Sequence, residues 1–254
     1  MDSKLPLSVA LISYNEEKNI ARTLNSIVDI ASEIVLVDSF STDKTVEIAQ
    51  EFGAKVFQEE WKGHIAQKNS ALKKCTQPWI LALDCDEVVS PTLKQSIIEV
   101  VNSNTKFGFR LHRKTFYLGK LLHFSWQPDW KLRLVRKDCN PRWEGINPHD
   151  SLTVDCQTKK IKGYLIHYSY KNLRHHMDKT IYYAKISAES YFKMGIRFSF
   201  FKLIFNPIFA FVKMFIFNLG LLDGFRGFLA SVSAWLSTFL KYLFLWELYH
   251  SSEV

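Results

Sequence analysis

Residues 79–87 read Trp-Ile-Leu-Ala-Leu-Asp-Cys-Asp-Glu, an apolar run that ends in acidic side chains. An apolar run of this length predicts a strand that is buried on both faces of a sheet. Asp84 and Asp86 would then stand one residue apart at the carboxyl end of the strand, where an open α/β sheet binds its ligands. Two carboxylates at this spacing can share one divalent cation, and that cation can bind a diphosphate.

Apolar strands and amphipathic helices alternate along the first ninety residues. Strands are predicted at 7–12, 34–37, 54–57 and 79–83, and helices at 16–31, 43–52 and 64–75. The alternation predicts an α/β fold with a mainly parallel, Rossmann-like sheet and helices on both faces. A further helix is expected to begin near Ser90-Pro91, and a long one from Asn172 to Met194.

Polar segments follow three of these strands. They are Ser-Tyr-Asn-Glu-Glu at 13–17, Asp-Ser-Phe-Ser-Thr-Asp at 38–43, and the acidic residues at 84–87. Because crossover connections are right-handed, the carboxyl ends of parallel strands meet at one edge, and the three segments should lie together. This half of the chain has no Gly-rich dinucleotide or P-loop motif, so a nucleotide would be held by carboxylates and a metal.

The three segments resemble the donor site of family 2 glycosyltransferases, which have the GT-A fold and bind a nucleotide-diphosphate sugar. This resemblance implies donor-binding roles for a set of polar residues, which are Tyr14, Glu16, Asp38, Asp43, Lys68 and Asp84. It further implies that Asp38 hydrogen-bonds the base or ribose, and that Lys68-Asn69 lies over the base or near the phosphates. Asp86 would be the main ligand of Mn2+ or Mg2+, with Asp84 facing the ribose or the water shell of the metal.

A second candidate for chemistry is Trp-Glu-Gly-Ile-Asn-Pro-His-Asp at residues 143–150. Inverting sugar transfer needs a group near the acceptor hydroxyl that takes its proton. We expect Asp150 to be this general base and His149 to contact the metal or a phosphate. The alternative is that Asp150 caps a turn and that His149 is a polar core residue.

The middle of the chain is strongly basic. Ten Lys or Arg residues lie between Lys106 and Arg142, against two aspartates, and Trp126, Trp130 and Trp143 are interleaved with them or follow directly. This composition suits an anionic, sugar-bearing acceptor, with the basic side chains from Arg110 to Arg142 holding its phosphates. A strand with a solvated basic face is the alternative. No RNA-recognition, zinc-finger or helix-turn-helix signature is present, so we expect no specific nucleic-acid partner.

The C-terminal third is rich in phenylalanine, with twelve of the twenty Phe residues between positions 198 and 244. Its longest uncharged run, 227–240, is shorter than the roughly twenty residues that cross a bilayer. We therefore expect amphipathic helices at a membrane interface; the alternative is that they pack on the catalytic domain or form a homodimer interface. We expect a catalytic domain over residues 1–170 and a C-terminal helical region over 171–254.

The N-terminal residues and the four cysteines indicate the cellular compartment. The N-terminal residues lack signal-peptide features, and the four cysteines form no C-x-x-C pair, so we expect reduced thiols in a cytoplasmic protein. Together with the apolar C-terminal third, this predicts a peripheral location on the cytoplasmic side of the inner membrane.

Over its whole length the sequence is similar to the lipopolysaccharide core β-1,4-glucosyltransferases. The resemblance implies an inverting transfer of glucose from UDP-glucose to an inner-core heptose, with a phosphorylated, lipid-linked core oligosaccharide as acceptor. An alternative is a glycosyltransferase that acts on a polyprenyl phosphate. An alternative of a different class is a basic nucleic-acid-binding protein.

Overall fold

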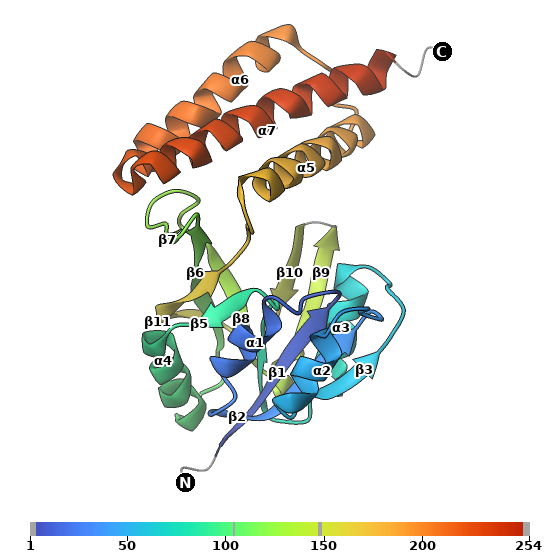
Figure 1. The fold of residues 1–254 in the computed structure, drawn as a ribbon, viewed down its shortest axis with the longest axis vertical. Coiled ribbons are helices and arrows are strands. Elements are labelled where there is room, and N and C mark those ends of the chain that lie inside the picture. The colour runs from blue at the N-terminus through green and yellow to red at the C-terminus, as the bar shows by residue number, and fades with distance from the viewer. Residues whose placement is uncertain (1–3, 104, 147–148, 251–254) are drawn as a thin grey trace. The chain divides into compact units, whose positions relative to one another are not determined.

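The structure is a computed structural model that describes residues 4–103, 105–146 and 149–250 (Figure 1). The main sheet has the order β3-β2-β1-β4-β8-β6-β11-β5, and β7 pairs with β6 beside this path. Its strands are β1 (Leu5–Ser13), β2 (Ala31–Asp38), β3 (Lys55–Gln58), β4 (Trp79–Ala82), β5 (Glu87–Val89), β6 (Gly108–Tyr117), β7 (Lys120–Leu121), β8 (Trp130–Arg136) and β11 (Thr158–His167). A separate hairpin consists of β9 (Arg142–Ile146) and β10 (His149–Thr153).

Strands β1 to β4 pair in parallel, which confirms the predicted α/β arrangement. In this register Ser13 lies opposite Asp38, so the first two polar segments begin side by side. The other half of the sheet is antiparallel: β8 pairs with β4 and β6, and β11 pairs with β5. The short strand β5, directly after the acidic segment, was not predicted.

Helices cover both faces of the parallel strands. They are α1 (Ile20–Asn25), α2 (Thr45–Glu51), α3 (His64–Lys74) and α4 (Pro91–Asn102). Alternation along β1 explains the two layers: Leu7 and Val9 belong to the core cluster that contains α1 and α4, while Ala10 packs in the cluster that contains α3. Ser90 caps α4 by accepting the Leu93 N–H, as Ser-Pro at a helix start predicts.

The chain divides into two compact units. The first contains residues up to 113 and residues 129–168, and the second contains residues 114–128 and those from 169 onward. The helical segments of the second unit are α5 (Leu173–Lys193), α6 (Phe200–Val212), the π-helical turn η2 (Lys213–Phe217), the 3-10 turn η3 (Gly220–Asp223) and α7 (Phe225–His250). Within this unit α7 packs against both α5 and α6.

Two helical segments of the second unit are long and apolar enough to cross a membrane. They are Phe200–Phe217 and Phe225–His250, and the test considers length and composition alone. The sequence had favoured no such segment, because Lys202, Lys213 and Lys241 interrupt the apolar runs. The first two lysines fall near the ends of Phe200–Phe217, where long side chains can reach polar surroundings.

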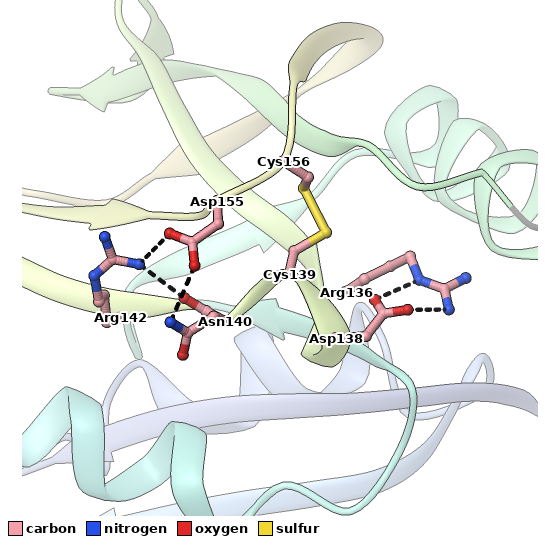
Figure 2. The surroundings of a disulfide bond; sticks show 7 residues. All are labelled: Arg136, Asp138, Cys139, Asn140, Arg142, Asp155 and Cys156. Atoms are coloured by element: carbon pink, nitrogen blue, oxygen red, sulfur yellow. Dashed lines mark hydrogen bonds and ion pairs between the residues drawn. A yellow bond between two sulfur atoms is a disulfide. The ribbon is translucent and has the colours of Figure 1, made fainter.

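The expectation that the cysteines are reduced thiols is wrong for two of the four, because Cys139 and Cys156 form a disulfide (Figure 2). The two residues are 17 apart in sequence, with Cα atoms 5.5 Å apart. Cys139 lies three residues before β9 and Cys156 three residues after β10. Because the two strands pair, the outer ends of the hairpin are adjacent, and this brings the two cysteines together. Cys75 and Cys85 are free and buried. Near the bond, Asp155 accepts hydrogen bonds from Arg142 and Asn140.

Candidate active site

The ends of β1 and β2 meet at the buried carboxylate of Asp38. Its Oδ1 accepts a 2.7 Å hydrogen bond from the Ser13 hydroxyl, and its Oδ2 accepts the Ser41 N–H at 2.8 Å. The segment after β2 therefore folds back over the strand end. The Ser41 hydroxyl also donates to Oδ1, so three of the roughly four lone-pair positions of this fully buried carboxylate are used within the protein.

The segments after β1 and β2 are also joined by their own side chains. Asn15 accepts the Thr42 N–H at 2.9 Å, and the Glu16 N–H donates to the Thr45 hydroxyl at 2.7 Å. Asp43 accepts bonds from Thr45 and from the Glu17 N–H. Burial alone would raise the pKa of Asp43, but these bonds outweigh it and lower that pKa. Asp43 therefore orders the two loops.

Tyr14 and Glu16 differ in how firmly they are held. Tyr14 is 59% exposed at the end of β1, so its ring is available to stack on a ligand. Glu16 instead accepts a 2.8 Å bond from the Asn19 amide, which fixes its carboxylate near the start of α1.

The acidic segment at residues 84–87 is anchored by backbone hydrogen bonds. Thr23 on α1 donates to the Cys85 carbonyl at 2.7 Å, and Glu87 accepts the Asp84 N–H at 3.1 Å. Cys85 points into the core, where burial raises the pKa of its thiol well above the ordinary value. The alternation of the segment therefore buries Cys85, while Asp84 and Asp86 are partly exposed on either side of it.

Asp84 is held by two cations. Its Oδ2 lies 2.7 Å from Arg133 Nη2, and its Oδ1 lies 3.2 Å from Lys68 Nζ. Burial alone would raise the pKa of Asp84, but Arg133 and Lys68 outweigh it and hold that pKa well below its ordinary value. Arg133 is 4% exposed and also pairs with the fully buried Glu87, at 3.0 Å. Arg113 pairs with the same Glu87 oxygen at 3.2 Å.

Asp86 faces a histidine that the sequence had not marked as a site residue. His167 Nε2, at the end of β11, lies 3.3 Å from Asp86 Oδ2. The pairing of β11 with β5 sets His167 opposite Glu87, and the Tyr168 N–H donates to the Asp86 carbonyl at 2.9 Å. A carboxylate oxygen is a ligand that suits Mn2+ or Mg2+, and an imidazole nitrogen is a ligand of transition metals. Within the described residues, no group of three or more His, Cys, Asp or Glu side chains could hold a metal.

The hairpin brings Asp150 to the acidic segment. Asp150 Oδ2 lies 2.9 Å from Lys68 Nζ, so Lys68 bridges Asp150 and Asp84. Asn69, the next residue on α3, fixes the hairpin by donating to the Trp143 carbonyl and accepting the Trp143 N–H. The Trp143 ring lies 4.2 Å from Lys68 Nζ, a cation–π contact. The side chain of His149 lies outside the part of the chain that the structure describes.

The basic middle segment contributes several of its side chains to ion pairs within the protein. Within the described residues, at least five of its ten cations form ion pairs with carboxylates of the protein, and they are Arg113, Lys131, Arg133, Arg136 and Arg142. Arg133 lies between Leu132 and Leu134 on β8. Because a buried charge needs a compensating partner, an arginine within this apolar strand is the feature of the sequence that indicates buried carboxylate partners.

Comparison with known proteins places these features in context. Residues 8–149 match the family described as Glycosyl transferase family 2. An uncharacterized glycosyltransferase of Rickettsia typhi is 32% identical, over 95% of this chain and 87% of the relative. The lipopolysaccharide core biosynthesis glycosyltransferase LpsC of Rhizobium meliloti is 27% identical, over 94% of this chain and 92% of the relative.

Solved structures share the fold. The mannosyltransferase PcManGT from Pyrobaculum calidifontis, solved with GDP-Man and Mn2+, has a TM-score of 0.55 and 14% identity, with 95% of this chain and 88% of the other covered. S. aureus TarS 1–349 with UDP has a TM-score of 0.52 and 14% identity, with 98% and 92% covered. At this identity the likeness establishes the GT-A-like fold.

Proposed function

Because the chain belongs to glycosyl transferase family 2, we propose that it transfers a hexose from a UDP-sugar to a core sugar of lipopolysaccharide, with inversion at the anomeric carbon. The similarity to LpsC over most of both chains supports the acceptor class. The more specific proposal is glucose from UDP-glucose to an inner-core heptose, and it rests on the resemblance of the whole sequence to core glucosyltransferases.

The observation that carries a single-site interpretation is the bridge formed by Lys68. Its ammonium lies 3.2 Å from Asp84, next to the proposed metal ligand, and 2.9 Å from Asp150, the proposed base. Two segments that are distant in the chain therefore share one charged group. The donor diphosphate and the acceptor hydroxyl must bind next to each other for the transfer to occur. The contacts of Lys68 with both carboxylates support one shared site for donor and acceptor.

The donor is proposed to bind across the ends of β1, β2 and β4. Asp38 would contact the base or ribose, and the exposed ring of Tyr14 would lie against the nucleoside. Glu16 and Asp43 would shape this part of the site through the loop contacts that they make. Lys68 would face the diphosphate, whose charge its ammonium complements.

A divalent cation, Mn2+ or Mg2+, is proposed to bind at Asp86. The facing imidazole of His167 supports a second protein ligand there, and His149 remains a proposed contact. Both oxygens of Asp84 contact cations of the protein, which supports a role for Asp84 in orienting the site from the metal's water shell. When bound, the cation would supply charge neutralisation of the departing diphosphate.

Asp150 is proposed to act as the general base. The acceptor hydroxyl oxygen would attack the anomeric carbon from the face opposite the diphosphate, and its proton would pass to the Asp150 carboxylate. The bond between the anomeric carbon and the diphosphate oxygen breaks as the new glycosidic bond forms. Lys68 holds Asp150 in a fixed direction, which supports this positioning.

The enzyme is proposed to work on the cytoplasmic side of the membrane, as a peripheral protein, because the proposed acceptor is lipid-linked. The LpsC similarity supports this location. We still propose a catalytic domain over residues 1–170 and a membrane-facing helical region over residues 171–254.

Calorimetric titration with UDP and UDP-glucose, with Mn2+ and then with EDTA, tests the proposal. We expect metal-dependent UDP binding that Asp86→Ala abolishes and that His167→Ala weakens at least tenfold. A Glu51→Ala variant on the surface of α2 is the matched control and should bind normally. Absence of nucleotide binding by the folded protein would overturn the proposed activity.

A further inference from the structure

One half of α6 is apolar and exposed. Its members recur at positions i, i+1, i+4, i+5, i+8 and i+9, which lie on one side of a helix with 3.6 residues per turn. We call them the anchor face: Phe200, Phe201, Ile204, Phe205, Ile208 and Phe209. Phe201 is 73% exposed and Phe209 is 62% exposed. An apolar surface of this density on one helix needs a partner.

The opposite side of α6 is already covered by the protein. Leu203 packs in a cluster with Tyr242 and Leu245 of α7, and Pro207 is also buried. Asn206 donates a 2.7 Å hydrogen bond to the Tyr242 hydroxyl. Because these contacts fix the rotation of α6 about its axis, the anchor face is directed away from α7.

The charges around the anchor face are of one sign. No Asp or Glu occurs between Glu189 and Asp223, whereas this stretch contains four cations, Lys193, Arg197, Lys202 and Lys213. All four are exposed. A second copy of the chain would bring these like charges together across a symmetric interface, while anionic lipid headgroups would neutralise them. The charge therefore favours a lipid surface as the occupant.

The turn between η2 and α7 is tied to residues 114–128 of the same unit. The Asp223 carboxylate accepts three backbone N–H bonds from residues 123–125, at 2.7 to 3.1 Å. Arg226 Nε donates to the Leu118 carbonyl at 2.8 Å. This end of α6 and η2 is therefore held beside the segment 118–125.

Chain length then decides on which side of a membrane this turn lies. The first unit ends at residue 113 and resumes at residue 129, so five residues lead to 118 and four lead back from 125. Extended chain covers about 3.5 Å per residue, so four residues reach roughly 14 Å, less than half of the ~30 Å apolar layer of a bilayer. The turn must therefore lie on the same side of a membrane as residues 113 and 129, to which these short segments connect it.

The other end of α6 lies on that side as well. It follows α5, which begins soon after residue 168 and carries charged residues along its length: Arg174, Asp178, Lys179, Lys185, Glu189 and Lys193. Charges distributed in this way exclude α5 from a bilayer. Both ends of α6 are thus on one side, and α7 has α5 packed against it. Neither apolar helix is free to cross.

We infer that the anchor face lies in the plane of an anionic lipid monolayer, with its phenylalanines in the interface and Lys202 and Lys213 at the headgroups. The inference deepens the proposed membrane location and rests on it. It requires no statement about the sugar donor, the metal or the catalytic base.

Vesicle flotation of the full chain tests the inference, with phosphatidylcholine vesicles and with vesicles that also contain phosphatidylglycerol. We expect binding to the anionic vesicles and release by alkaline carbonate. The triple variant F201Q/F205Q/F209Q should weaken binding about 1,000-fold or more, because each of the three buried Phe side chains contributes a factor of about ten or more. K202E/K213E should remove the preference for anionic lipid. The matched control is I181Q/Y182Q/Y183Q, three exposed apolar residues on α5.

Three results would overturn the inference. Retention in the membrane after carbonate treatment would mean that a helix crosses it. Normal vesicle binding by the anchor-face variant would place the contact elsewhere, and a dimer in solution that the same variant dissociates would assign the face to a second copy. UDP binding should be unchanged in every one of these variants. If the unmodified chain binds vesicles but does not bind UDP, the proposed activity is refuted and the inference about the anchor face is not.

Discussion

Lys68 and Asp150 form an ion pair, with 2.9 Å between Nζ and Oδ2, although one residue is on α3 and the other on the β9–β10 hairpin. Both side chains are only 13% exposed. Because the same ammonium lies 3.2 Å from Asp84, the proposed base is connected to the acidic segment through one lysine. The hairpin is therefore held to α3 by this ion pair as well as by the hydrogen bonds between Asn69 and Trp143.

Removal of the Lys68 charge should impair turnover more than folding. In Lys68→Met, the carboxylates of Asp84 and Asp150 would face each other without the intervening cation, so we expect kcat/KM to fall about 100-fold or more. Steady-state kinetics with UDP titration in parallel separates loss of donor binding from loss of the base position. Lys73→Met, an exposed lysine on the same helix, should behave as the unmodified enzyme. Equal effects of both changes would contradict the bridge.

Asp150→Asn should distinguish a hydroxyl acceptor from a phosphate acceptor. A sugar hydroxyl must lose its proton as it attacks, so loss of the base should lower kcat by a factor of about 100 to 10,000. A polyprenyl phosphate is already ionised and would lose only a few-fold. The amide keeps the size of the side chain, and Asp155→Asn outside the hairpin is the control. A few-fold loss in Asp150→Asn would favour the phosphate acceptor.

Arg133 should contribute strongly to stability, because it is buried between Asp84 and Glu87. Arg133→Gln would leave the fully buried Glu87 with less compensation, and we expect a loss of about 3–5 kcal/mol in the free energy of unfolding. Urea denaturation measures this. Arg136→Gln removes a surface pair with Asp138, shown in Figure 2, and should cost about 0–1 kcal/mol. Similar losses in both variants would contradict the buried network.

The parallel half of the site follows from the sequence, because period and topology determine it. Continuous apolar strands predict a parallel sheet, and a parallel sheet places the residues after β1, β2 and β4 on one edge. The register of Ser13 with Asp38 is the direct expression of this rule. The apolar run before them also placed Asp84 and Asp86 just beyond the carboxyl end of β4, and the structure adds that Cys85 between them is buried.

The antiparallel half could not be predicted in the same way. Arg133 and His167 are on β8 and β11, and the site contacts of both depend on strand pairings between distant segments. Local periodicity does not specify those pairings, so His167 gave no signal beyond its residue type. The pairing of Cys139 with Cys156 likewise required the hairpin, whose two ends are adjacent only after β9 and β10 have paired.

Thiol titration should reveal the disulfide at the base of the hairpin. In protein purified without reductant, the unfolded chain should expose two thiols, Cys75 and Cys85, and four after reduction. The loop closed by the bond spans 17 residues, so reduction should lower the free energy of unfolding by about 3 kcal/mol. A Cys139→Ser/Cys156→Ser variant should match the reduced protein. Four reactive thiols before reduction would contradict the bond.

His176 should make stability depend on pH in the mildly acidic range. Its ring is 1% exposed and pairs with the Tyr117 hydroxyl at 2.7 Å, and burial with the nearby charge of His175 lowers its pKa from 6.5 to about 4. The unfolded chain therefore binds this proton first as pH falls. Stability should be highest above pH 6.5 and decline towards pH 4, by roughly 3 kcal/mol in all.

The decline should disappear in His176→Gln, which can keep a hydrogen bond to Tyr117 but does not titrate. His250→Gln, which changes an exposed histidine, serves as the control.

A second decline in stability should appear at lower pH from Glu33, whose pKa is lowered to about 2. Burial alone would raise this pKa, but hydrogen bonds from Lys55, Ser8 and Thr76 outweigh burial. Its contribution is complete above pH 4.5 and is lost towards pH 2. Urea unfolding across pH 2–8 therefore separates the His176 step from the Glu33 step. Identical curves of stability against pH for His176→Gln and the unmodified chain would contradict the first step, because they would show that His176 binds its proton equally in the folded and unfolded states.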